Sequence, residues 1–197
     1  KYTGISTSGA AVGHGLNNPP EMIFLKRTSS TSNWYVYNKD LGTTSVYDNY
    51  LLLNSSNATN YSVGVFSPNG VNSSTFIPGN NAVLQGTMIA YCWHSVAGYS
   101  SIGTYTGNGN ATGTIVSLDF APSFVMIKGT DQTSDWIMID NKRDTTNPNA
   151  ARLDANSSGQ EYTGENIMDL NSDGFQLKTS SSSKNGLDKV FIYMAFK

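Results

Sequence analysis

The sequence predicts an all-β fold, a β-sandwich built from two internal repeats of about 100 residues each. Three observations support this prediction. Short runs rich in Val, Ile, Tyr, Phe, Trp and Thr are bounded by Gly, Pro, Asn and Ser, which is typical of strands and turns. No window shows sustained apolar spacing at about 3.6 residues, which an amphipathic helix requires. The sequence also matches itself along much of its length.

The internal match is the strongest of these observations. Residues 20–34 align with residues 122–136 without a gap, and residues 88–93 align with residues 191–196 after a slippage of one residue. The first alignment contains the identical pairs Pro20/Pro122, Lys26/Lys128, Thr28/Thr130, Thr31/Thr133, Ser32/Ser134 and Trp34/Trp136. The same offset also relates the Asn-Ser-Ser triplets that begin at Asn54 and Asn156, a match that chance alone could give. The whole series indicates a duplication.

The clearest elements are two hairpins at equivalent places in the repeats. Residues 22–27 and 34–38 are predicted strands, joined by the loop Thr28–Asn33. Residues 124–128 and 136–140 are their counterparts. Each hairpin carries a tryptophan near the start of its second strand, and we expect both to be largely buried because aromatic side chains dominate core packing. Lys26 and Lys128, which follow the apolar run of each first strand at its loop end, are expected to be structural, with the stem packed and the ammonium at the surface.

The first strands of these hairpins also bear on domain organisation. Met22–Leu25 and Phe124–Ile127 are continuously apolar, so both faces of each strand are expected to be covered. The segment between the repeats has no Pro and no long Gly/Ser run, so it is a poor flexible linker. We therefore favour one β-sandwich domain over residues 1–197, with repeats 1–95 and 103–197 related by a pseudo-twofold axis. Two tandem sandwiches are the alternative.

Composition narrows the function classes. A formal net charge of −2 and a pI near 5.6 argue against binding to nucleic acid or to an anionic membrane. No apolar run reaches the roughly 18 residues that span a bilayer, so no membrane insertion is expected. A single cysteine, Cys92, excludes an intrachain disulfide framework and a cysteine-based zinc cluster. The chain starts at Lys1 without Met, so we expect an excised domain or a processed product.

The duplication also serves as a control in the search for a site, because positions that differ between the copies are free to carry a copy-specific function. Divergence is sharpest where Tyr47, Asp48, Asn49 and Tyr50 face residues 149–152. Two aromatic rings beside Asp and Asn suit a sugar, which stacks on the rings and hydrogen-bonds to the polar groups. This loop is the predicted ligand-binding site. The alternative is a turn that happens to contain tyrosines.

Metal sites and catalytic groups have little support. Residues 169–174 fit the opening of a calcium loop, but its twelfth position is Ser180 and flanking helices are absent, so we predict a turn and no metal. Asp140–Asp144 is interpreted as a hydrogen-bonded loop. His14 has no partner motif, and Cys92 with His94 lacks a third group to orient the pair. We expect no catalytic residue and no cofactor. A glycosidase site with two facing carboxylates remains an alternative, because the distance between the two groups depends on the fold and is not visible in the sequence.

Taken in order, the motifs of the whole chain resemble an uncharacterised β-domain in virion proteins of tailed bacteriophages, especially marine ones, often within tail-fibre chains. The resemblance covers residues 1–197 and is carried by Tyr2-Thr-Gly, Val12-Gly-His-Gly-Leu, Asn33-Trp-Tyr-Val-Tyr, Ala90-Tyr-Cys-Trp, Gly103-Thr-Tyr-Thr-Gly-Asn-Gly, Phe124-Val-Met-Ile-Lys, Arg143-Asp and Ile192-Tyr-Met-Ala-Phe. Asn38 and Asp173 depart from residues common in that family, His and Asn. The resemblance implies an exposed virion module with a jelly-roll or concanavalin-like sandwich, and it transfers no catalytic residue.

These observations lead to one functional expectation and two rivals. We expect a non-enzymatic virion structural or tail-fibre-type module on the extracellular surface of the particle, which serves host attachment or glycan binding. Its expected partners are other virion proteins, a host surface glycan and further copies of itself. The first rival is an architectural decoration or assembly domain without a ligand. The second is a polysaccharide depolymerase.

Overall fold

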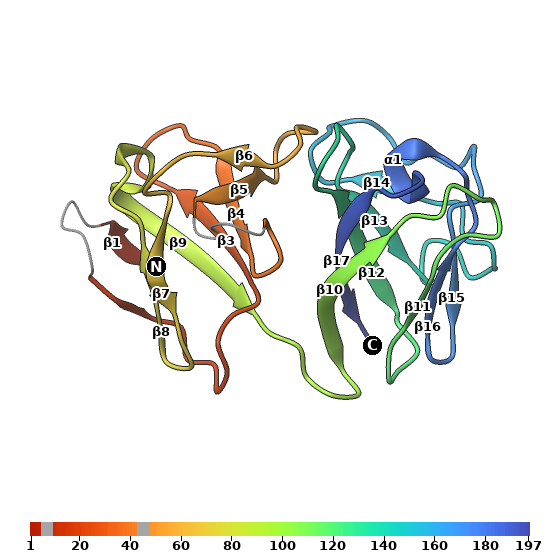
Figure 1. Ribbon diagram of the computed structural model, residues 1–197, viewed down its shortest axis with the longest axis horizontal. Coiled ribbons are helices and arrows are strands. Elements are labelled where there is room, and N and C mark those ends of the chain that lie inside the picture. Colours follow the sequence, from red (N-terminus) through yellow and green to blue (C-terminus); the bar gives the residue numbers. More distant parts are fainter. Residues whose placement is uncertain (5–9, 43–47) are drawn as a thin grey trace. The chain divides into compact units, whose positions relative to one another are not determined.

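The structure is a computed structural model that describes residues 1–4, 10–42 and 48–197 (Figure 1). It confirms the predicted all-β class, since the described residues form several antiparallel sheets with one short α-helix and one short 3-10 helix. The chain divides into two compact units. Unit 1 comprises residues 1–54 and 59–94, and unit 2 comprises residues 55–58 and 95–197. Among the described residues, no helix has the length and apolar character needed to cross a membrane.

Unit 1 contains a six-stranded and a three-stranded antiparallel sheet. The large sheet has the order β1 (Tyr2–Gly4), β9 (Gly86–Trp93), β3 (Met22–Arg27), β4 (Trp34–Asn38), β5 (Asn49–Leu52) and β6 (Asn60–Tyr61). The small sheet has the order β2 (Val12–Gly13), β8 (Thr75–Pro78) and β7 (Phe66–Val71), and the 3-10 helix η1 (Ala82–Leu84) precedes β9. The first predicted hairpin is thus confirmed as β3 and β4 with the expected bounds.

Unit 2 has the same plan. Its large sheet has the order β10 (Ser100–Thr106), β17 (Val190–Phe196), β12 (Phe124–Gly129), β13 (Ile137–Asp140) and β14 (Leu153–Asp154). Its small sheet has the order β11 (Ile115–Ser117), β16 (Gly174–Leu177) and β15 (Met168–Asn171), and helix α1 (Ser182–Asn185) precedes β17. In both units the first strand of the hairpin lies between its hairpin partner and the last strand of the unit. In the second predicted hairpin, formed by β12 and β13, strand β13 begins one residue later than predicted.

Each unit buries apolar side chains between its large and small sheets, because alternate residues of a strand point to the same face. In unit 1, Ile23 and Leu25 of β3 pack with Phe66 and Phe76 of the small sheet. In unit 2, Val125, Ile127 and Ile139 pack with Phe175 and Leu177. All four side chains of Met22–Leu25 are buried, as the continuous apolar run predicts.

The two hairpin tryptophans differ in burial. Trp136 is 1% exposed, which agrees with the expectation, whereas Trp34 is only partly buried. The ring of Trp34 lies parallel to Tyr91 at a centroid distance of 6.3 Å, and the ammonium of Lys26 stands over it at 5.6 Å. The burial expected from the repeat therefore holds fully in one copy only.

Candidate functional site

A pocket of about 370 Å³ opens in unit 1 at the loop end of the β3–β4 hairpin. We call it the Arg27 pocket. It is lined by Arg27, Thr31, Ser32, Asn33, Tyr35 and Asn54, with Val83 of η1 beside them. The volume lies within the range of small-ligand sites, about 300–1,000 Å³. Its lining is polar and drawn from the predicted loop Thr28–Asn33 and the strands on either side.

Strand parity places Arg27 in this pocket. Arg27 shares the core-facing side of β3 with Ile23 and Leu25, but it is the last residue of the strand, so its side chain emerges at the end of the core. Its Nε donates to the Ser29 Oγ over 3.3 Å. Among the described residues, no carboxylate forms an ion pair with this guanidinium.

Gly86, at the start of β9, makes room for that guanidinium. A Cβ at this position would lie 2.5 Å from the Ser29 Oγ and 3.1 Å from the Arg27 Nε. The φ angle of Gly86 is +90°, a conformation that side-chain-bearing residues rarely adopt. Glycine is therefore required here for space and for backbone geometry together.

Tyr35 supplies a hydroxyl at the wall of the pocket. Its side chain is 7% exposed, and its ring lies 5.4 Å from the ring of Tyr50. Burial, and secondarily the neighbouring Tyr50, raises the pKa of Tyr35, while a hydrogen bond with the Asn33 side chain opposes the shift. The hydroxyl stays protonated at neutral pH and can donate to a ligand.

The Asn54 side chain holds Asn33 and Trp34, at the start of β4, through two hydrogen bonds. Its Oδ1 accepts the backbone N–H of Trp34 at 2.8 Å, and its Nδ2 donates to the Asn33 Oδ1 at 3.0 Å. Asn33 is thereby held through its Oδ1, and its side chain also hydrogen-bonds to Tyr35. The sequence signal for this clamp was the Asn-Ser-Ser match between the copies, which on its own could have been chance.

The equivalent place in unit 2 is occupied differently. At the repeat offset, Arg27 corresponds to Gly129, Ser29 to Asp131 and Tyr35 to Ile137. With the slippage of one residue, Gly86 corresponds to Lys189. The Lys189 ammonium lies 3.5 Å from the Asp131 carboxylate, so an ion pair stands where unit 1 has a glycine and a serine. Arg27, Asn33 and Tyr35 are therefore specific to the first copy. The other polar lining residues, Thr31, Ser32 and Asn54, have identical counterparts in the second.

The structure does not gather the residues of the predicted ligand site around this pocket. Tyr47 lies outside the described residues. Asp48 lines a separate pocket of about 190 Å³ with Phe66 and Pro78, and its Oδ1 accepts the Gly64 N–H at 3.4 Å. The other two members have structural contacts: the Asn49 amide donates to the Leu41 carbonyl at 3.1 Å, and Tyr50 packs behind Tyr35.

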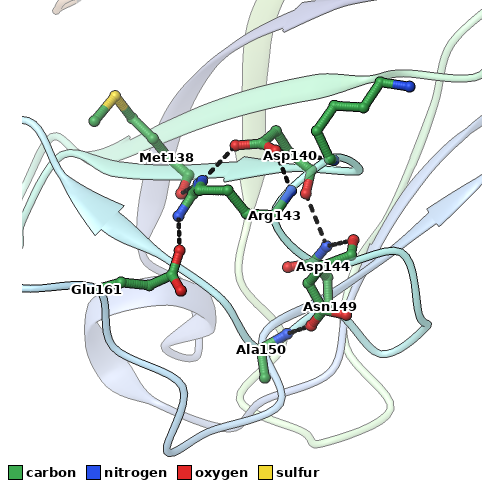
Figure 2. Close-up of polar contacts among 8 residues, drawn as sticks. Met138, Asp140, Arg143, Asp144, Asn149, Ala150 and Glu161 are labelled. Atoms are coloured by element: carbon green, nitrogen blue, oxygen red, sulfur yellow. Dashed lines mark hydrogen bonds and ion pairs between the residues drawn. The ribbon is translucent and has the colours of Figure 1, made fainter.

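A polar cluster in unit 2 shows the opposite case, an arginine that is fully paired (Figure 2). Arg143 donates through Nε to Asp140, through Nη1 to Glu161 at 3.0 Å and through Nη2 to the Met138 carbonyl at 2.9 Å. The adjacent Asp144 accepts from the Ala150 N–H and from Thr146, and these bonds hold the pKa of Asp144 at about 2. These groups are committed to the loop, which agrees with its interpretation from the sequence.

The remaining candidates for chemistry are also engaged. His14 and Cys92 line a pocket of about 250 Å³ in unit 1. The His14 Nδ1 accepts the Leu16 N–H at 3.0 Å, and its Nε2 bonds to the Asn72 carbonyl at 2.9 Å. Burial raises the pKa of the Cys92 thiol to about 11, so the thiolate needed for nucleophilic attack is not formed at neutral pH.

The calcium-like pattern lies on a β-hairpin. Asp169 belongs to β15, where it lies 3.3 Å from the Lys178 ammonium, and Asp173 lies in the turn before β16. The described residues contain no group of three or more His, Cys, Asp and Glu side chains that could hold a metal ion.

Comparison with known proteins identifies one relationship. A family model described as a domain of unknown function, DUF7483, matches residues 1–197, which is the whole chain. No curated protein matches the chain, and no solved structure matches it.

Proposed function

We propose a function for this chain, which belongs to the DUF7483 family of domains of unknown function: it is a non-enzymatic surface module that binds a carbohydrate. The observation that carries the proposal is the Arg27 pocket. The two units share one sheet order, and only the first has an arginine, a tyrosine and two asparagines at the positions that line this pocket. Binding sites are commonly formed by loops on a rigid framework. A shared framework that carries these polar groups in only one unit fits that arrangement.

The chemistry of the lining suits a sugar. Vicinal hydroxyls both donate and accept, and the pocket offers donors from Arg27 and Tyr35 and amide groups from Asn33 and Asn54. None of the described residues that line the pocket is acidic, so the pair of carboxylates that a depolymerase needs is missing from this lining. Binding without cleavage is the function that these groups support.

The biological setting of the proposal comes from the resemblance to virion domains of tailed phages. A module of this kind would sit in a tail fibre or another exposed virion protein and attach the particle to a host surface glycan. A single small polar pocket gives weak affinity, so attachment depends on many copies displayed together, as in a homo-oligomer. The Asp48 pocket is the alternative place for the ligand.

A glycan array probed with the isolated chain tests the proposal. We expect binding to at least one saccharide, loss of that binding in Arg27→Gln, and unchanged binding in the matched control Lys142→Gln, which removes an exposed cation in unit 2. An array on which the folded chain binds nothing would favour the rival, an architectural domain whose surface contacts only other virion proteins. Release of shortened chains from host polysaccharide would favour a depolymerase.

A further inference from the structure

We infer that the ligand of the Arg27 pocket is an acidic sugar, whose carboxylate is bound by the Arg27 guanidinium. This inference rests on the proposed function, because it specifies the ligand class of the same pocket.

The loop end of the β3–β4 hairpin is positively charged, whereas the equivalent residues of unit 2 are negatively charged. Residues 27–33 contain Arg27 and no acid, whereas the equivalent residues 129–135 contain Asp131 and Asp135 and no base. Both acids of the second copy are replaced by neutral hydrogen-bonding residues in the first. The whole chain has a net charge of −2, so the positive character of this pocket is local and not a property of the whole protein.

The pairing of Arg27 leaves its charge available. Arg143 shows how this chain neutralises a structural arginine, with two carboxylates and a carbonyl around one guanidinium. Among the residues that the structure describes, the Arg27 guanidinium has a single hydrogen bond to a neutral group, from Nε to the Ser29 Oγ. That contact orients the side chain and leaves the two terminal NH2 groups for a ligand. A planar guanidinium with free terminal nitrogens matches the two oxygens of a carboxylate.

The neighbours of Arg27 are compatible with an anion. Asn33 stands where the second copy has Asp135, so no fixed negative charge repels a carboxylate at that position. The protonated Tyr35 hydroxyl is a further donor, and a carboxylate is an acceptor-only group. The remaining hydroxyls of the sugar ring then meet Thr31, Ser32 and Asn54.

The experiment compares acidic oligosaccharides with their own methyl esters by isothermal titration of the intact chain. The probes are oligomers of galacturonate, glucuronate and mannuronate and a sialylated trisaccharide, each as the free acid and as the carboxyl methyl ester. Esterification removes the charge and leaves the ring unchanged. We expect at least one free acid to bind roughly tenfold or more tighter than its ester, because hydrogen bonds to a charged group are the stronger ones. The preference should shrink as salt is raised.

Variants assign that preference to the arginine. Arg27→Gln should bind the acid and the ester equally, and Arg27→Lys should keep only part of the preference, since it retains the charge without the planar fork. Lys142→Gln should behave as the unmodified chain. Because the ester comparison is made on the unmodified protein, the inference stays testable if an Arg27 variant fails to fold.

The outcomes separate the inference from the proposed function. Equal affinity for acid and ester, or binding only to neutral saccharides, would overturn the inference and leave glycan binding intact. Tighter binding to a sulfated galactan oligomer than to every carboxylated probe would overturn the assignment of a carboxylate. Absence of binding to any saccharide, charged or neutral, would overturn the proposed function itself.

Discussion

Asn156 accepts the backbone N–H of Trp136 through its Oδ1 at 2.8 Å, and Asn54 makes the same bond to Trp34 at the same distance. Each asparagine also donates to the residue that precedes the tryptophan, Asp135 in one case and Asn33 in the other. The side chain closes the start of the second hairpin strand in both units. In unit 1 the same clamp also forms one wall of the Arg27 pocket.

Asn156→Ala should lower the free energy of unfolding by about 1–2 kcal/mol, because the partly buried Trp136 N–H would lose its acceptor. Asn54→Ala should cost about 0.5 kcal/mol, because the Trp34 N–H is exposed and water can replace the side chain. Urea denaturation measures both values. Asn57→Ala, at an exposed position, is the control and should change stability little; equal losses in the two clamp variants would contradict the role of burial.

Gly86→Ala should weaken ligand binding, whereas Gly98→Ala should not. Both glycines have a positive φ, +90° and +69°, so each substitution carries a backbone penalty of about 1–3 kcal/mol. A Cβ at Gly98 meets nothing within 4 Å, while one at Gly86 would push against Ser29 and Arg27. The comparison of the two variants, by denaturation and by titration of the saccharide, isolates the effect on the pocket. Equal binding in both would show that Gly86 does not position Arg27.

Lys128 should make stability rise with pH between about 8 and 10.5. The side chain is fully buried, and its Nζ bonds to the Gly129 carbonyl at 2.9 Å and the Ser56 carbonyl at 3.3 Å. Burial lowers the pKa of Lys128 from 10.5 to about 8, against the opposing effect of Asp135. Below pH 8 both the folded and the unfolded chain hold the proton. Above it the folded chain releases the proton first, so the cost of burying the charge is relieved.

Lys128→Met removes that titration. Urea midpoints of the unmodified chain and the variant, measured from pH 7 to pH 10, should diverge in favour of the unmodified chain as pH rises. Parallel curves would show that Lys128 keeps an ordinary pKa in the folded state. The comparison with the variant cancels the other lysines and tyrosines that titrate in the same range.

Asp48→Ala and Tyr50→Ala separate the two candidate ligand sites. Tyr50 packs on Tyr35, so its truncation should lower stability by about 1–3 kcal/mol and weaken binding at the Arg27 pocket. Among the described residues, the Asp48 side chain accepts one long hydrogen bond, from the Gly64 N–H, so Asp48→Ala should leave both stability and binding nearly unchanged. Thermal unfolding and the glycan array provide the two measurements. Loss of binding in Asp48→Ala, at unchanged stability, would move the ligand to the Asp48 pocket.

The sequence by itself determined the all-β class, the hairpin 22–27 with 34–38 and the burial of Met22–Leu25, because strand alternation and turn composition are local properties of the chain. The internal sequence match located the second hairpin and the positions that differ between the two matching segments. It did not say which differences meet in space, and the divergent loop at Tyr47–Tyr50 stood out because its residue types changed most.

Only the tertiary structure brought Arg27, Tyr35 and Asn54 together with Gly86, which lies far along the chain on the neighbouring strand β9. The proximity of these residues depends on the order and register of the strands, which decide which loop lies beside the start of which strand. Neither the order nor the register is encoded in a local sequence pattern. The exchange of Ser29 and Gly86 for Asp131 and Lys189 was visible in the sequence as two unrelated differences. In the structure the two positions lie side by side in each unit. Ser29 and Gly86 lie beside the Arg27 guanidinium in unit 1, whereas Asp131 and Lys189 form an ion pair in unit 2.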